Sequence, residues 1–191
     1  LKKKIPISLD TRKSNIMKKG INLGVKLIND VSGLDFDSET VSVLQKTKIP
    51  FVIQHSQGIP ENMQKKPTYK NELLDIYDFF EKKIKQLRSK GIKHNNIILD
   101  PGIGFGKNLK HNMSLIHNIS IFHSLGFPIL VGNSRKKFIK ELSGKNDSKS
   151  RNGGTIASSI YLMMQGVQIL RIHDVNEIMQ GIKIFKKIIN N

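Results

Sequence analysis

Short apolar runs that end in polar or charged residues recur along this chain. The runs are rich in isoleucine, valine and leucine, and each is followed by a turn or a helical pattern. Such runs are typical of strands that are covered on both faces, as in parallel sheets. The pattern therefore predicts strands over 5–10, 25–30, 50–55, 97–100, 128–132 and 166–174.

Between these runs, apolar residues recur at helical spacing. In the clearest case, Leu73, Tyr77, Phe80 and Ile84 fall on one side of a helix. Alternating strands and helices with short connections indicate parallel βα packing. The predicted helices cover 14–24 (ending at Gly20 or Gly24), 39–47, 71–90, 109–125, 155–165 and 176–189, with a basic, polar insert over 143–152.

Each predicted strand ends in, or is soon followed by, a polar side chain. Because parallel strands open their carboxyl ends on one face, these side chains are expected to meet there and form a site. Arg171 and His173 alternate along the last predicted strand, so both would point the same way. The side chains in question are Asp10, Asn29, His55, Asp100, Lys136, Arg171 and His173.

The fourth strand runs into a glycine-rich loop over 100–107, in which Asp100 is followed by Pro101 and three alternating glycines. A carboxylate delivered to such a loop indicates a ligand site, although a lone loop of this kind favours the simpler interpretation of a strand followed by a tight turn. The loop lacks the spacing and the terminal Ser or Thr of a P-loop. Lys107 is expected to be a solvent-facing loop residue rather than a catalytic one.

Length and composition limit the class of protein. The chain has 191 residues, 38% of them hydrophobic and none of them cysteine, which fits a single domain over 1–191 without disulfides or thiolate metal sites. No apolar run approaches the roughly 18–20 residues that a membrane span needs. The basic start lacks the apolar block of a signal peptide. We expect a cytoplasmic protein with no membrane partner.

The chain is strongly basic, with a formal net charge of +17. This excess attracts anions, and nucleic acid is the first candidate. However, the lysines are scattered over predicted helix surfaces, and no recognisable nucleic-acid module is present. The abundance of Lys, Asn and Ile indicates a compositional bias, so we expect no nucleic-acid partner.

Several of these motifs, taken in order, resemble the dihydropteroate synthase family. Single motifs are weak, but the ordered set is specific and covers essentially the whole chain. The motifs are Ser8-Leu9-Asp10-Thr11, Ile28-Asn29-Asp30, His55-Ser56-Gln57-Gly58, the segment 100–107, Ser134-Arg135-Lys136, Arg151-Asn152-Gly153-Gly154-Thr155 and Arg171-Ile172-His173-Asp174.

The resemblance implies a TIM (β/α)8 barrel of the α/β class, usually a homodimer, that acts in folate biosynthesis. The family is a transferase that joins p-aminobenzoate to 6-hydroxymethyl-7,8-dihydropterin diphosphate and releases pyrophosphate, and sulfonamides compete for the p-aminobenzoate position. A barrel has eight units and about six are visible, so we expect the first two units to be missing, before Leu1.

The resemblance also implies roles for the strand-end residues. Asp100 would accept two parallel hydrogen bonds from the pterin's 2-amino-4-oxo edge. Asp10 would stabilise positive charge that develops on the pterin. Lys136 would donate to the carbonyl edge. The expected pterin-binding residues are Asp10, Asn29, Asp100, Phe105, Gly132, Lys136 and Arg171; Ser134 would contact p-aminobenzoate, Arg171 and His173 the diphosphate, and the catalytic set is Asp10, Lys136, Arg171 and His173.

The chain departs from the family at several points. Mg²⁺ is the expected cofactor, but the family's metal ligand lies in an amino-terminal segment, so this chain is expected to supply none. Gln54 and Ser56 flank His55 where the family often has methionine, and Gln54 would alter the pterin pocket. Asn133 replaces a further methionine.

Two other interpretations stay open at this point. One is a truncated, non-catalytic fragment or pseudo-enzyme that only binds a pterin or folds only with another chain. The other is a pterin-dependent methyltransferase, which shares the barrel. Lys136, Arg171 and His173 argue against methyl transfer, since that reaction has no diphosphate to hold.

Overall fold

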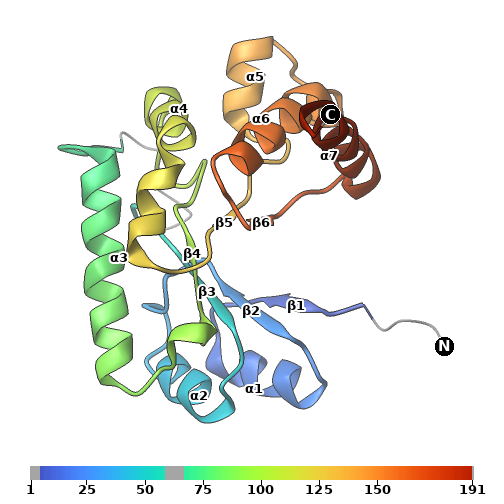
Figure 1. Ribbon diagram of the computed structural model, residues 1–191. Helices are drawn as coiled ribbons and strands as arrows, with labels where there is room; N and C mark the ends of the chain where they lie inside the picture. Colours follow the sequence, from blue (N-terminus) through green and yellow to red (C-terminus); the bar gives the residue numbers. More distant parts are fainter. Residues whose placement is uncertain (1–4, 59–66, 191) are drawn as a thin grey trace.

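Six short parallel strands lie in chain order as a sheet of four and a sheet of two, which an isolated bridge joins into one curved layer (Figure 1). The computed structural model describes residues 5–58 and 67–190. The first four strands pair in the order β1-β2-β3-β4, and a bridge from Leu99 to Ile129 leads on to β5, which pairs with β6. The strands are β1 (Ser8–Asp10), β2 (Leu27–Asp30), β3 (Phe51–Gln54), β4 (Ile97–Asp100), β5 (Leu130–Val131) and β6 (Ile169–Leu170).

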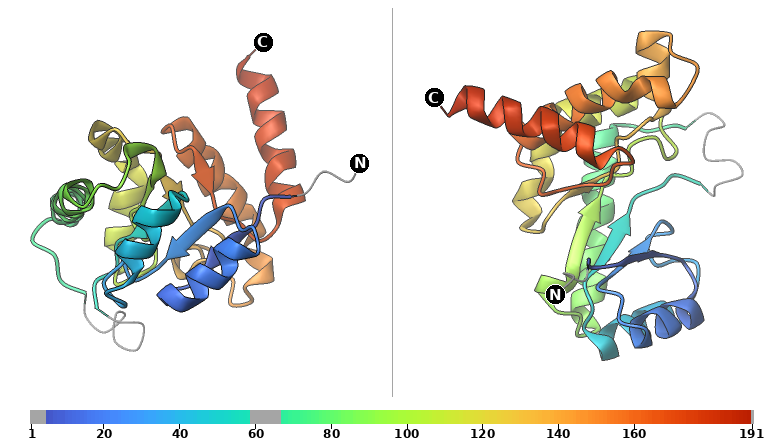
Figure 2. Two further views of the ribbon diagram at one scale, coloured as in Figure 1. Left: turned by 90° about the horizontal axis from the view of Figure 1, so that it is seen from below. Right: turned by 90° about the vertical axis from the view of Figure 1, so that its right-hand side faces the viewer.

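Helices follow the strands and pack along the outer side of the sheet. The last of them extends beyond the sheet, and its carboxyl-terminal end projects away from the other elements (Figure 2). The helices are α1 (Ser14–Asn22), α2 (Thr40–Thr47), α3 (Glu72–Ser89), α4 (Leu109–His117), α5 (Lys137–Ser143), α6 (Asn152–Met164) and α7 (Val175–Ile189), with 3-10 turns η1 (His94–Asn96), η2 (Ile119–Leu125) and η3 (Lys149–Arg151).

The strands bury two different sets of side chains because successive residues point to opposite faces. The outward set joins helix residues such as Met17, Phe80 and Phe122 in the main core. A second, smaller cluster consists of Val52, Ile98 and Leu130, with Leu27 and Ile169 packed against it, and it lies on the inner face of the sheet. The outward set includes Ile28, Phe51, Ile53, Ile97, Leu99, Ile129 and Val131.

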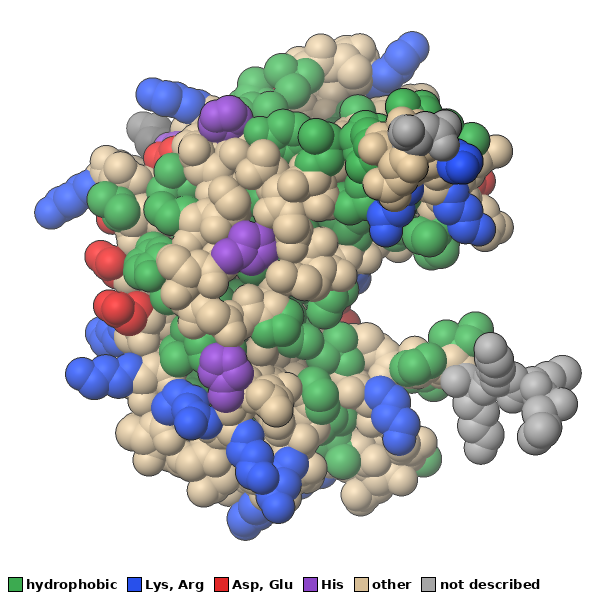
Figure 3. Space-filling view, viewed as in Figure 1, with side chains coloured by type: hydrophobic (Ala, Val, Ile, Leu, Met, Phe, Trp, Pro, Cys, Tyr) green, Lys and Arg blue, Asp and Glu red, His purple; other side chains and the backbone are tan. Residues whose placement is uncertain are grey.

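The architecture is a partial β/α barrel with six strand–helix units, as the sequence predicted. Its ends remain apart: Figure 3 shows the molecule hollowed where β1 and α7 face one another. Over the part of the chain that the structure describes, no helix is long and apolar enough to cross a membrane.

Two local predictions were wrong, and one helix was missed. The helix expected over 109–125 ends at His117 and continues only as the turn η2. Asn118 follows the helix, and its backbone and side-chain N–H groups both donate to the Ser114 carbonyl. Helix α5 was not foreseen. The strand expected over 166–174 is limited to β6, so Arg171 and His173 follow the strand instead of alternating along it.

Candidate binding site at the carboxyl ends of the strands

The inner face of the sheet changes from apolar to polar in a single step at the carboxyl ends of the strands. Each residue of the inner apolar cluster is followed, two positions later, by a residue at the candidate site. Because the side-chain period of a strand is two, the residues that lie within strands, Asn29, Gln54 and Asp100, share the inner face, and Gly132 and Arg171 come just after β5 and β6. The pairs are Leu27 with Asn29, Val52 with Gln54, Ile98 with Asp100, Leu130 with Gly132, and Ile169 with Arg171.

Asp100 lies at the centre of this polar layer and is almost fully buried, with 4% of its surface exposed. Its Oδ1 accepts a hydrogen bond from the Gly102 N–H at 2.8 Å. Burial raises the pKa of Asp100 to about 6, and the Gly102 bond and the charges of Lys136, Lys107 and Arg171 work against that rise. At pH 7 the side chain is therefore mostly a carboxylate, which is a strong acceptor in a nearly dry site.

The glycine loop packs closely against the end of β3, and this contact explains its composition. Gly102 has φ +72°, and a Cβ there would lie 2.0 Å from the carbonyl oxygen of His55. Gly106 has φ +61°, and its Cβ would lie 2.5 Å from the Gln57 carbonyl oxygen. Only glycine combines this backbone conformation with so close an approach.

Lys136 and Phe105 form one wall of the site. The Lys136 ammonium lies 4.1 Å from the centre of the Phe105 ring, within the range of a cation–π interaction. Both side chains are half-buried. Burial lowers the pKa of Lys136, the charge of Asp100 opposes that change, and the charge of Arg171 adds to it.

Across the gap between the first and last strands, the side chain of Asp10 on β1 approaches that of Arg171, which follows β6. Asp10 Oδ2 accepts from Asn29 Nδ2 at 3.2 Å and lies 3.5 Å from an Arg171 guanidinium nitrogen. The Asp10 and Arg171 side chains are 49% and 59% exposed, so this long ion pair adds little to stability. Its significance is positional, because it brings residues 161 positions apart to one edge of the site.

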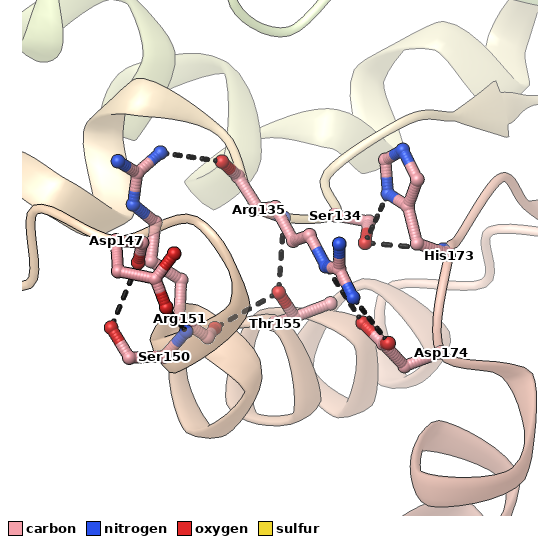
Figure 4. A network of polar contacts seen from close by, with 8 residues as sticks. All are labelled: Ser134, Arg135, Asp147, Ser150, Arg151, Thr155, His173 and Asp174. Carbon is pink, nitrogen blue, oxygen red and sulfur yellow. Dashed lines mark hydrogen bonds and ion pairs between the residues drawn. The ribbon is translucent and has the colours of Figure 1, made fainter.

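Ser134 and His173 are held together by two contacts (Figure 4). The Ser134 hydroxyl lies 2.9 Å from His173 Nδ1 and also accepts from the His173 backbone N–H at 3.2 Å. Ser134 is buried. A cavity of about 320 Å³ is lined by Gly132, Ser134, Arg135, Lys136, Ser148, Arg171 and His173.

An ion-pair network supports the segment that carries Ser134 and Lys136 (Figure 4). Arg135 donates to both carboxylate oxygens of Asp174, at 2.9 and 2.5 Å. Arg151 donates to the Arg135 carbonyl at 2.8 Å, and the Thr155 hydroxyl accepts from the Arg135 N–H at 3.1 Å. Arg135 has φ +58°, an uncommon conformation that these contacts stabilise.

The structure thus brings the predicted site residues to one face, while their individual roles stay predictions.

Lys107, expected to face solvent, is instead 3% exposed. Its ammonium donates to the Phe105 carbonyl at 2.9 Å and lies 3.1 Å from His55 Nδ1. Burial lowers the pKa of Lys107 to about 7. Burial and the charge of Lys107 together lower the pKa of His55 to about 3, so His55 is neutral. No pattern in the sequence indicates this burial, since a lysine after a glycine loop is usually exposed.

Comparisons with known proteins agree with this geometry. The sequence model of a family described as pterin binding enzyme matches residues 1–173. A dihydropteroate synthase of Synechocystis sp. is 36% identical over 180 residues, which cover 94% of this chain and 62% of that protein. That of Escherichia coli (strain K12) is 34% identical, with 93% and 62% covered. The chain therefore spans about 62% of the length of these curated relatives.

Solved structures give the same match in three dimensions. The dihydropteroate synthase of Yersinia pestis, in complex with a sulfonamide drug, has a TM-score of 0.93 at 35% identity, covering 99% of this chain and 68% of that one. The enzyme of Thermus thermophilus, in complex with 6HMPPP, has a TM-score of 0.90 at 34% identity, with 96% and 72% covered.

Proposed function

Because this chain belongs to the pterin binding enzyme family, we propose that it provides the pterin-binding part of a dihydropteroate synthase of folate biosynthesis. The reaction joins p-aminobenzoate to 6-hydroxymethyl-7,8-dihydropterin diphosphate. The bond from the pterin's methylene carbon to the diphosphate oxygen breaks, and its electron pair leaves with pyrophosphate. A bond forms to the amino nitrogen, which loses a proton. The chain covers 62% of the length of a curated relative. The complete reaction is therefore proposed for the whole enzyme, and pterin binding for the portion that this chain provides.

The single observation that carries this proposal is the buried carboxylate of Asp100 beside the Lys136–Phe105 pair. A pterin offers two parallel N–H donors at its 2-amino-4-oxo edge, and a carboxylate matches that pair. Lys136 would donate to the carbonyl next to those donors, while the Phe105 ring would face the heterocycle. A ligand with no such donor pair would displace water from a buried carboxylate without replacing its hydrogen bonds, which is costly.

The remaining strand-end residues suit the transfer step. Asp10, half exposed at the open edge of the site, would stabilise positive charge as the carbon–oxygen bond breaks. Arg171 and His173 would hold the departing diphosphate. Ser134, bonded to His173, would contact p-aminobenzoate. Asn29 would contribute an amide contact to the pterin, and Gly132 leaves room beside Arg171.

Mg²⁺ remains part of the proposal only for the complete enzyme. Among the residues that the structure describes, no group of three or more His, Asp or Glu side chains is placed to hold a metal ion. These residues do not form a magnesium site by themselves, and ligands from outside them, including diphosphate oxygens, would be needed. We therefore assign no step of the reaction to the metal.

We also propose a homodimer and a cytoplasmic location, with small-molecule substrates as the other partners. An apolar groove of about 470 Å³ between α4, α5 and α6 offers a surface for a second copy. It is lined in part by Met113, Ile116, Phe138, Leu142 and Tyr161. The molar mass in solution, measured by light scattering during gel filtration, tests this proposal.

Pterin binding without transfer is a second candidate function. It is favoured by the exposure of Asp10 and Arg171, which leaves the reacting side of the site open to water. A transfer site excludes water around the reacting atoms. The two candidates share the Asp100 pocket and differ only in turnover.

A thermal melt of the purified chain with and without the dihydropterin diphosphate tests both. A ligand that binds only the folded form at a hundredfold excess over Kd stabilises it by about 2.7 kcal/mol. An upward shift in Tm supports the pterin site, and a subsequent assay for dihydropteroate separates the enzyme from the binding chain. A cooperative melt whose Tm does not change with the dihydropterin diphosphate contradicts both candidate functions.

A further inference from the structure

Gln54 occupies the inner face of β3 at the level of the candidate site. Its neighbours Phe51 and Ile53 belong to the outer core, whereas Val52 belongs to the inner cluster. Gln54 therefore points inward, two positions beyond Val52. In the register of the sheet it is the direct partner of Asp100, and only 3% of its surface is exposed.

The side-chain amide of Gln54 is buried without being satisfied. Its Nε2 has no hydrogen-bond partner among the described residues. The Oδ1 of Asn29, on the same face of neighbouring β2, is also buried and unpaired within the described part of the chain. Buried polar groups in folded proteins are almost always hydrogen-bonded, and an unpaired one is costly. A donor and an acceptor left open on adjacent strands, beside a buried carboxylate, indicate a ligand that completes them.

We propose that Gln54 is a pterin-contacting residue, whose amide N–H donates to the ring nitrogen that flanks the pterin's 2-amino group. This inference rests on the proposed function, because it takes a pterin as the ligand of the site. It adds a contact that the family resemblance did not imply, since methionine, which the family often has here, cannot donate a hydrogen bond.

The order of the strands determines which acceptor Gln54 meets. Asp100 on β4 would take the two N–H donors of the ring edge. Lys136 follows β5, on one side of β4, and would meet the carbonyl oxygen at one end of that donor pair. Gln54 lies on β3, on the opposite side of β4, and so would meet the other end. There the neighbour of the 2-amino group is a ring nitrogen with a lone pair.

The test compares the wild-type chain with Gln54→Met, which keeps a similar volume and removes the donor. The probe is 6-hydroxymethylpterin, and Kd is measured by isothermal titration calorimetry. We expect Kd to rise about tenfold in Q54M, which corresponds to about 1.4 kcal/mol. The Tm of the ligand-free protein should stay the same or rise, because the substitution removes an unsatisfied buried group. Gln86→Met, on the exposed side of α3, is the matched control and should leave both quantities unchanged.

The outcomes separate this inference from the function on which it rests. A higher Kd with an unchanged or higher Tm supports a ligand contact, and Gln54→Glu, which also adds a charge beside Asp100, should weaken binding further. If the wild type binds pterin and Q54M binds it with the same Kd, the proposed role of Gln54 is wrong, and the proposed pterin site is unaffected. A fall in Tm with unchanged Kd assigns Gln54 a structural role instead, and a wild-type chain that binds no pterin overturns both proposals.

Discussion

The ammonium of Lys136 lies 4.1 Å from the centre of the Phe105 ring, and the two residues come from the segments that follow neighbouring strands β5 and β4. Burial disfavours the charged form of Lys136, and the negative face of the Phe105 ring stabilises it. Phe105 therefore helps to keep Lys136 charged and in place beside Asp100.

Phe105→Leu should weaken pterin binding while leaving the fold intact. Leucine keeps an apolar wall but removes the ring that faces the ammonium, a loss of about 1 kcal/mol or roughly fivefold in Kd. Calorimetric titration with 6-hydroxymethylpterin measures the effect. Phe185→Leu, a half-buried position on α7, is the control. Equal affinities for F105L and the wild type would show that the pair does not contribute to binding.

Pterin affinity should fall as the pH drops through the pKa of Asp100, which is about 6. The protonated carboxyl accepts poorly, so apparent affinity follows the ionised fraction and should drop about tenfold from pH 7 to pH 5. Titrations at both pH values measure this. Asp100→Asn should bind weakly and show a flat profile, which separates titration of the protein from that of the ligand. A wild-type profile as flat as that of D100N would contradict the role.

The buried Lys107 should make the protein more stable as the pH rises above 7. Its pKa is about 7 in the folded chain against an ordinary 10.5, so between these values the unfolded chain holds a proton that the folded chain does not. The free energy of unfolding then increases with pH in this window, and the gain is lost as the pH falls toward 7.

Urea unfolding at pH 7 and pH 9 measures this effect as the difference between the wild type and Lys107→Met. We expect the difference to move in favour of the wild type by about 2 kcal/mol at the higher pH. Lys110→Met, an exposed neighbour, should show no such change. A difference that is independent of pH would mean that Lys107 keeps its proton in the folded chain up to pH 9.

Gly102→Ala should destabilise the fold strongly. The added Cβ would lie 2.0 Å from the His55 carbonyl oxygen in a backbone conformation, φ +72°, that alanine rarely adopts. Strain and displacement together should lower the free energy of unfolding by about 2–4 kcal/mol. Gly153→Ala is the matched control, because nothing lies within 4 Å of its added Cβ and its position in α6 favours alanine. Similar urea midpoints for the two variants would show that the loop can move away from β3.

The six strand–helix units and the polar layer could be predicted because both depend on local rules, the periodicity of apolar residues and the meeting of parallel strand ends, whereas the barrel was expected from the family resemblance. Asp10, Asn29 and Asp100 could be assigned from their position in the pattern alone. The burial of Lys107 could not, since it depends on how closely the glycine loop lies against β3. The contact between His173 and Ser134 also escaped the pattern, because β6 ends before His173 and the loop is shaped by tertiary contacts.

The inner and outer faces of the sheet are separated by a single residue of register, and this affects which coding changes the chain tolerates. Deleting one codon ahead of Gln54 in β3, while the strand keeps its pairing, would turn Gln54 toward the helices and bring His55 opposite Asp100. A substitution in the same strand changes the contacts of one side chain. Such a deletion instead moves inward-facing side chains to the outer face and outward-facing ones to the inner face. Length variation in this protein should therefore accumulate in the segments between strands, and drift within the strands should proceed by replacement alone.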